Sequence, residues 1–197
     1  MPTSNEIISA LVGAWKIARR DPSAMQAFDF SADAFWRSFA AFIFAVPFYL
    51  VFITAEWRMI GDAGIEIVTT LPAYTLIELL SYAAYWALYP LTMVFICRSF
   101  GLTATYAPYI IVYNWSSILV AVLMAPPYVL YSLGLASSET AALLVFVAFV
   151  TALLYRWQIA LTVLGTTSSI AAAVVAVELV LGILISMVAS GFLSIGA

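Results

Sequence analysis

Five apolar stretches, each about long enough to cross a lipid bilayer as a helix, constrain this chain more than any other feature of its sequence. A helix needs about 20 residues to cross a hydrocarbon core of about 30 Å. Only 9% of the residues are charged and the mean hydropathy is +1.10, so the chain cannot cover a water-exposed surface with polar groups. We therefore predict an all-α fold, a polytopic membrane helical bundle of five transmembrane helices. The predicted spans run from about Ser38 to Thr54 (extended by Phe35 and Trp36), Leu71 to Cys97, Thr103 to Met124, Ala141 to Leu164 and Ile170 to Leu193.

Prolines mark the boundaries and bends of these spans. Pro72 suits the first turn of the second span and Pro90 should kink it, while Pro47 lies within the first span. The Pro126-Pro127 pair predicts the end of the third span. The apolar stretch from Tyr128 to Leu135 is then too short to cross, so it would lie at the interface or form a re-entrant turn. The longest predicted outer loop runs from about Ala55 to Thr70.

Residues 1–34 are predicted to form a cytosolic amphipathic segment ahead of a transmembrane domain over residues 35–197. Thr3 and Glu6 have the spacing of a capping box, and Pro22 ends the helix. A short helix with an apolar face, a Trp and flanking basic residues suits a membrane surface. The alternative is docking against the protein's own spans. The predicted apolar face holds Ile8, Leu11, Trp15 and Ala18, and the opposite face holds Ser9, Gly13, Lys16 and Arg20.

The positions of the basic residues predict the orientation in the membrane. Six of the seven fall on the same side as the N-terminus, and only Arg58 falls on the other; the six are Lys16, Arg19, Arg20, Arg37, Arg98 and Arg156. The loops on the other side hold Glu56, Asp62, Glu66 and Glu139. We therefore expect a cytosolic N-terminus and a C-terminus on the far side of the membrane, which in a bacterial inner membrane is the periplasm.

Composition argues against several function classes. The chain has no histidine and one cysteine, Cys97, which removes Ser-His and Cys-His catalysis, His-ligated haem and the usual zinc sites. It has no basic run that could follow a nucleic-acid backbone and no Gly-rich phosphate loop. No paired carboxylates at ligand spacing support a membrane enzyme. We expect no enzymatic activity, no cofactor, no metal and no nucleic-acid partner.

Three charged residues and one amide within the predicted spans are the candidate site residues: Glu78, Arg156, Glu178 and Asn114. Charged side chains in hydrocarbon are costly and usually face the bundle interior. Arg156 and Glu178 each lie 11 residues from Thr167, the centre of the turn between the last two spans. At the rise of a helix, both are about 16 Å from that turn. Asn114 is expected at a similar depth, which predicts one polar layer near the midplane.

Small residues repeat every four positions on the faces of Arg156 and Glu178. Small residues let helices approach closely in lipid. We therefore predict a tight hairpin of the last two spans, locked by an Arg156–Glu178 ion pair. Two alternatives remain: Arg156 snorkels to the inner surface, or the pair forms a functional ion site. The helix-packing residues are Ala148 and Ala152 on one helix, and Gly182 and Ser186 on the other.

Glu78 is predicted to lie only about 9 Å below the outer surface, too shallow to pair easily with Arg156. Its helix face carries hydroxyl groups. One interpretation is a proton or cation site; the other is a carboxyl group that tyrosines satisfy or that reaches the outer interface. The hydroxyl residues on this face are Tyr74, Ser81, Tyr82, Tyr85 and Tyr89.

A short cytosolic lead, five spans and the Leu71-Pro72 start of the second span resemble the bacterial branch of the Yip (Ypt-interacting protein) domain superfamily. The resemblance covers the chain's topology and implies an integral-membrane helical bundle, with eukaryotic members linked to vesicle trafficking. It carries over no site residues. We predict a binding or scaffolding component that acts through helix faces or lipid contacts, with membrane lipids and a membrane-protein partner or second copy as partners. The alternative is a small transporter or channel subunit that uses the intramembrane carboxylates.

Overall fold

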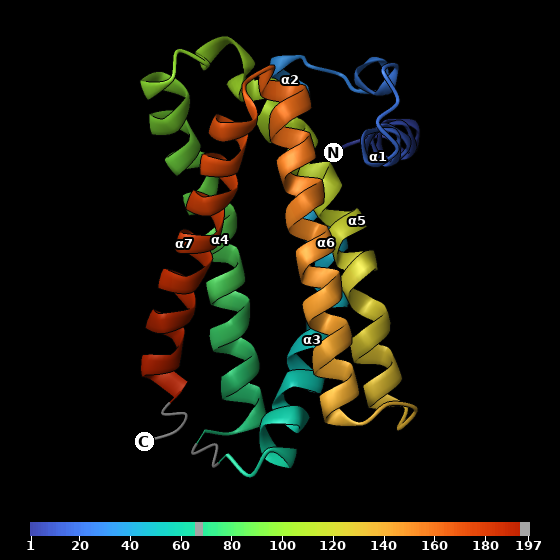
Figure 1. The fold of residues 1–197 in the computed structure, drawn as a ribbon, viewed down its shortest axis with the longest axis vertical. Helices are drawn as coiled ribbons and strands as arrows, with labels where there is room; N and C mark the ends of the chain where they lie inside the picture. The colour runs from blue at the N-terminus through green and yellow to red at the C-terminus, as the bar shows by residue number, and fades with distance from the viewer. Residues whose placement is uncertain (66–68, 194–197) are drawn as a thin grey trace.

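The computed structural model describes residues 1–65 and 69–193, and its regular elements in these ranges are all helices (Figure 1). Within these ranges, five helical segments are long and apolar enough to cross a membrane. This confirms the all-α fold and the multi-pass membrane character. The elements are α1 (Ser4–Ala18), η1 (Ala24–Ala27), α2 (Ala32–Ser38), α3 (Ala41–Asp62), α4 (Leu71–Ser99), η2 (Thr103–Thr105), α5 (Tyr106–Ser132), α6 (Ser138–Leu164) and α7 (Ser168–Leu193).

Helix α5 is the centre of the bundle. It packs against α1, α2, α3 and α6, and it has a larger share of buried residues than any other span described. Helix α7 packs against α4 and α6, so it joins the α4 side of the bundle to the α5–α6 side (Figure 1). The α6–α7 turn lies at the same end of the bundle as α2, whereas the α5–α6 turn lies at the opposite end (Figure 1).

The prediction that Pro126-Pro127 ends the third span is wrong. Helix α5 continues through both prolines to Ser132, so most of the Tyr128–Leu135 stretch belongs to the span. Tertiary contacts hold the extra turns: the Tyr128 hydroxyl donates to Glu56 Oε1 at 2.6 Å, and its ring stacks on Phe52 with centroids 4.8 Å apart. Proline weakens a helix but does not forbid it where neighbouring helices fix the chain.

The predicted outer loop is also shorter than expected. Helix α3 extends to Asp62, so Glu56 lies inside a helix and contacts α5. The sequence placed the boundary early because charged residues begin at Glu56. Glu66, predicted in the same loop, lies outside the described residues.

Helix α1 begins as predicted, because Thr3 Oγ1 accepts the backbone N–H of Glu6 at 3.2 Å. Its buried face is not the predicted one. The buried residues are Ala10, Gly13, Ala14 and Ile17, whereas Ile8 and Trp15 are exposed. Small residues allow a close approach, and a Cβ at Gly13 would lie 2.5 Å from the Phe28 ring.

Helix α1 runs across the spans, since it is seen nearly end-on where the spans run vertically (Figure 1). It packs on α5 and α6, and the Tyr155 hydroxyl donates to the Ala14 carbonyl at 2.7 Å. In the structure, α1 is therefore docked against the protein's own spans. Apolar side chains on its outer side remain exposed.

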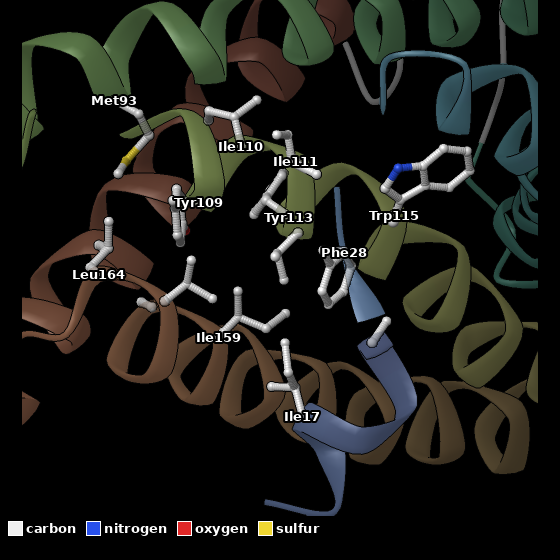
Figure 2. Packing of buried hydrophobic residues seen from close by; sticks show 14 of the residues in the cluster. Ile17, Phe28, Met93, Tyr109, Ile110, Ile111, Tyr113, Trp115, Ile159 and Leu164 are labelled. Carbon is white, nitrogen blue, oxygen red and sulfur yellow. The ribbon is translucent and has the colours of Figure 1, made fainter. Parts of the chain in front are cut away.

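The main core is built around α5, with buried residues from α1, α4, α6 and α7. Figure 2 shows Ile17 of α1, Phe28 of the following link and Ile159 of α6 beside Tyr109 and Tyr113 of α5. Cys97 is 1% exposed and belongs to this core, as expected of an apolar filler.

Candidate functional site

The structure places the Arg156 and Glu178 side chains together between α6 and α7. Arg156 Nε lies 3.3 Å from Glu178 Oε1, and the two side chains are 8% and 12% exposed. Each residue lies about three turns from the α6–α7 connection, and equal depth on adjacent antiparallel helices brings them level. The structure therefore has the ion pair that the spacing predicted.

Arg156 makes several contacts with α5 in addition to its ion pair with α7. Its Nη1 donates to the Tyr113 carbonyl and the Ser116 hydroxyl, both at 3.1 Å, and its Nη2 donates to the Ser117 hydroxyl at 2.8 Å. Its Cζ also lies 3.8 Å from the centroid of the Tyr113 ring. Snorkelling of Arg156 is therefore wrong: the guanidinium is buried and uses its donors inside the bundle.

A short chain of tyrosine hydroxyls extends this site to α4. The Tyr113 hydroxyl donates to Glu178 Oε1 at 2.7 Å and lies 2.7 Å from the Tyr85 hydroxyl. Because the Tyr113 hydroxyl donates its one hydrogen bond to Glu178, it accepts a hydrogen bond from the Tyr85 hydroxyl. A second buried pair, Tyr89 and Tyr109, has its hydroxyls 2.7 Å apart. We call the set of Arg156, Glu178, Tyr113, Tyr85, Ser116 and Ser117 the Arg156 cluster; it connects α4, α5, α6 and α7.

The tight small-residue interface predicted between α6 and α7 does not form. A Cβ on Gly182 would meet no heavy atom within 4 Å, and Ser186 is exposed. Ala148 and Ala152 are buried, but on the face of α6 that carries Arg156 toward α5. The small side chains thus let α6 approach α5, whereas α7 meets the bundle through the Arg156–Glu178 pair and through the buried core residues Ala171 and Val174.

The predicted polar layer also differs in membership, because Asn114 does not join the ion pair. Asn114 Nδ2 donates to the Ser38 hydroxyl of α2 at 2.9 Å, and both residues are buried. Successive helix residues point about 100° apart, so the neighbours Tyr113 and Asn114 reach different helices. The side chains that meet Arg156 are instead Ser116 and Ser117, which lie three and four residues after Tyr113.

Glu78 lies in a separate cluster nearer the other end of the bundle. The Tyr49 hydroxyl of α3 donates to Glu78 Oε2 at 3.3 Å, so the hydrogen-bond partner comes from a neighbouring helix rather than from the hydroxyl-rich face of α4. The Tyr49 ring stacks on Tyr82, with centroids 4.2 Å apart. Glu56 has a matching contact with Tyr128, so each of these two half-buried carboxyl groups accepts from a tyrosine.

A third polar group ties α1 to the start of the first span. Arg37 Nε lies 2.9 Å from Glu6 Oε2, and Arg37 Nη2 lies 3.0 Å from Asp29 Oδ2. The pKa of Asp29 is lowered, chiefly because the Ser31 backbone N–H donates to its carboxylate at 2.9 Å and secondarily by the Ser31 hydroxyl and Arg37. Glu6 was expected to complete a capping box, but its carboxylate pairs with Arg37 instead.

These clusters offer few open coordination positions. Among residues 1–65 and 69–193, no group of three or more acidic or cysteine side chains lies close enough to hold a metal ion. In the same ranges Glu178 Oε2 is the buried side-chain oxygen without a hydrogen-bond partner. It is the atom of the Arg156 cluster at which a proton or a small cation would bind.

Sequence reasoning missed Tyr113 and Glu56. Tyr113 belongs to the most polar stretch of the third span, and the i, i+3, i+4 spacing of Tyr113, Ser116 and Ser117 was the available signal. Glu56 gave no such signal, because its burial depends on the unexpected continuation of both α3 and α5.

Comparison with protein-family models, curated proteins and solved structures found no match for this chain. The resemblance to the Yip superfamily therefore stays a prediction.

Proposed function

We propose that the chain is a non-enzymatic binding or scaffolding component of a bacterial inner membrane, acting through its helix faces and lipid contacts. The supporting observation is the occupancy of Arg156. Its guanidinium has two hydroxyls, one carbonyl, one carboxylate and one aromatic ring of the same chain as partners. A buried guanidinium whose donors already bond groups of the same chain holds helices together, and it has few donors left to bind a substrate.

The outer faces of α6 and α7 fit this role. Large apolar side chains cover them, and lipid tails or apolar partner helices are what such faces contact within a bilayer. The exposed residues include Leu143, Phe146, Val147 and Leu154 on α6, and Ile183, Leu184, Met187 and Val188 on α7.

We place the α1 end of the bundle in the cytosol, with α1 at the membrane interface. The proposal rests on the basic residues near that end and on the exposed apolar side chains of α1, Ile8 and Trp15. A reporter enzyme that works only in the periplasm should be active when it is fused after Ser132. A reporter that works only in the cytosol should be active when it is fused after Ser99. Opposite activities would reverse the orientation.

Reconstitution tests the scaffold role against its competitor. Purified full-length protein in vesicles that enclose either a pH-sensitive or a cation-sensitive dye should give no proton or cation flux above protein-free vesicles. A photo-crosslinking residue in place of exposed Leu184 should give adducts with lipids or a discrete polypeptide in intact membranes. The same residue in place of buried Val174 should react only within the chain. Flux, or equal labelling patterns at both positions, would contradict the scaffold.

The second candidate is a small proton- or cation-coupled transporter or channel subunit. Glu178 Oε2, buried and without a partner in the described residues, favours it. A flux that Glu178→Gln abolishes and Glu78→Gln leaves intact would establish this function at the Arg156 cluster. A flux sensitive only to Glu78→Gln would assign it to the other carboxyl cluster.

A further inference from the structure

An apolar groove of about 670 Å³ lies between α1 and the outer faces of α5 and α6. Its shaft is lined by aliphatic side chains, and polar groups lie at the α1 end. The groove follows α6 from Thr151 to Gln158, a rise of about 10 Å along the helix. The shaft residues are Ile118, Leu119, Val122, Leu123 and Leu154, and the groups at the α1 end include Trp15, Arg20, Trp157 and Gln158.

Arg20 has an unusual backbone at the rim of this groove. It is the non-glycine residue with positive φ in the described part of the chain, at 57°. The Arg20 N–H bonds the Ile17 carbonyl and the Asp21 N–H bonds the Lys16 carbonyl, both at 2.9 Å. This is the Schellman pattern, in which glycine normally takes the left-handed position because it has no Cβ. A residue that costs stability at a solvent-accessible position points to a use for its side chain.

The charges around Arg20 favour an anion. Lys16 and Arg19 lie in the same turn, where Lys16 Nζ donates to the Ser23 hydroxyl at 3.1 Å. The neighbouring carboxylate of Asp21 accepts from the Ser23 backbone N–H at 2.8 Å. Among residues 1–65 and 69–193, neither Arg19 nor Arg20 makes a salt bridge. Arg20 is the basic residue that lines the groove, and its charge beside the aliphatic shaft complements a ligand with an anionic head and an apolar chain.

We propose that this groove binds an anionic phospholipid of the surrounding bilayer, with its phosphate at Arg20 and one acyl chain along α5 and α6. The inference rests on the proposed lipid-contacting role and names the lipid and its site. Arg20 supplies the charge, the aliphatic shaft supplies apolar contact, and α1 lies across the spans where a headgroup would meet it. The site thereby explains why an arginine occupies a position suited to glycine.

Binding to the delipidated full-length protein tests the site. Native mass spectrometry of protein in mild detergent would measure the affinities for phosphatidylglycerol and for phosphatidylcholine with the same acyl chains. Arg20→Gly keeps the backbone conformation and removes the charge. It should weaken phosphatidylglycerol binding about fivefold, the contribution of one basic residue near an anionic membrane surface. It should weaken phosphatidylcholine binding less, because the choline of that lipid compensates the charge of its phosphate, and it should leave folding intact. Arg98→Gln, an exposed arginine outside the groove, should change neither affinity.

Filling the shaft tests the acyl-chain half. Thr151→Trp should weaken binding of both lipids, whereas Leu143→Trp, exposed on the same helix but outside the groove, should not. Each of three results would overturn the proposed site. The first is an unchanged phosphatidylglycerol affinity in Arg20→Gly, and the second is an equal loss of that affinity in Arg98→Gln. The third is unchanged binding of both lipids in Thr151→Trp. So would a co-purified polypeptide that protects the groove and that phospholipid does not displace. A flux in the vesicle assay would contradict the scaffold function but would not change these lipid-binding results. Failure of the proposed function and failure of the proposed lipid site can therefore be told apart.

Discussion

Replacing Arg156 with leucine should be among the most destabilising single changes in this chain. The substitution removes the guanidinium that connects α6 to α5 and α7, and it leaves Glu178 buried without its cation. Removing one member of a buried ion pair costs about 3–5 kcal/mol, because the remaining charge has lost its partner.

The contacts of Arg156 give a similar figure. Three hydrogen bonds to α5, at about 0.6 kcal/mol each within a membrane protein, contribute about 2 kcal/mol. The desolvated contact with the Tyr113 ring adds about 2 kcal/mol. We therefore expect Arg156→Leu to lower the free energy of unfolding by about 4 kcal/mol. The exposed Arg98→Leu serves as the matched control, with an expected change within about 0.5 kcal/mol.

Unfolding of the full-length protein in mixed micelles by increasing SDS, followed by circular dichroism, would measure these values. The double variant Arg156→Leu with Glu178→Leu should be more stable than Arg156→Leu alone, since it leaves no unpaired charge. The charge swap of Arg156→Glu with Glu178→Arg should not restore stability. In the swap, a carboxylate would face the Tyr113 carbonyl, and two acceptors cannot bond each other.

Two results would refute this account of the Arg156 cluster. A loss of less than about 1 kcal/mol in Arg156→Leu would mean that the α5 contacts contribute little. Full recovery in the charge swap would mean that the ion pair alone matters and that the contacts with α5 are incidental.

Further predictions concern helix docking and the ends of the bundle. Gly13→Ala should cost about 1–3 kcal/mol in the same SDS assay, because its Cβ would overlap the Phe28 ring. Gly182→Ala has open space for its Cβ and should be neutral or stabilising by up to about 1 kcal/mol. A clear loss of stability in this variant would instead support the tight α6–α7 interface. Asn114→Leu should cost about 1–2 kcal/mol, since it leaves the buried α2 hydroxyl that accepts from Asn114 without its donor, and a thermal shift assay would detect the loss. The Asp29 pKa is lowered in the folded chain, so its contribution is present above the unfolded pKa of about 3.9 and is lost as pH falls through the folded value. Tryptophan fluorescence should therefore report loosening of α1 only below about pH 4, and loosening near pH 7 would contradict this assignment.

The fold was predictable where one physical constraint dominates. A bilayer requires about 20 apolar residues per crossing, so the number and approximate positions of the five spans follow from hydropathy alone. Their ends were less predictable. The charge at Glu56 and the Pro126-Pro127 pair both signal a boundary locally, yet the Glu56–Tyr128 hydrogen bond keeps both segments helical. No local rule reports a contact between residues 72 positions apart.

The candidate site divides in the same way. The sequence by itself determined that Arg156 and Glu178 lie at equal depth, because two positions equally far from a tight turn are level on antiparallel helices. Only the tertiary structure decided that these two side chains face each other and which way the other side chains point. The rotation of α5 turns Tyr113 toward Arg156 and Asn114 toward Ser38. The packing of α1 buries its small residues and leaves Trp15 exposed. Depth is set by counting residues along one helix, whereas rotation is set by packing against several helices at once, and the sequence of one helix does not contain that information.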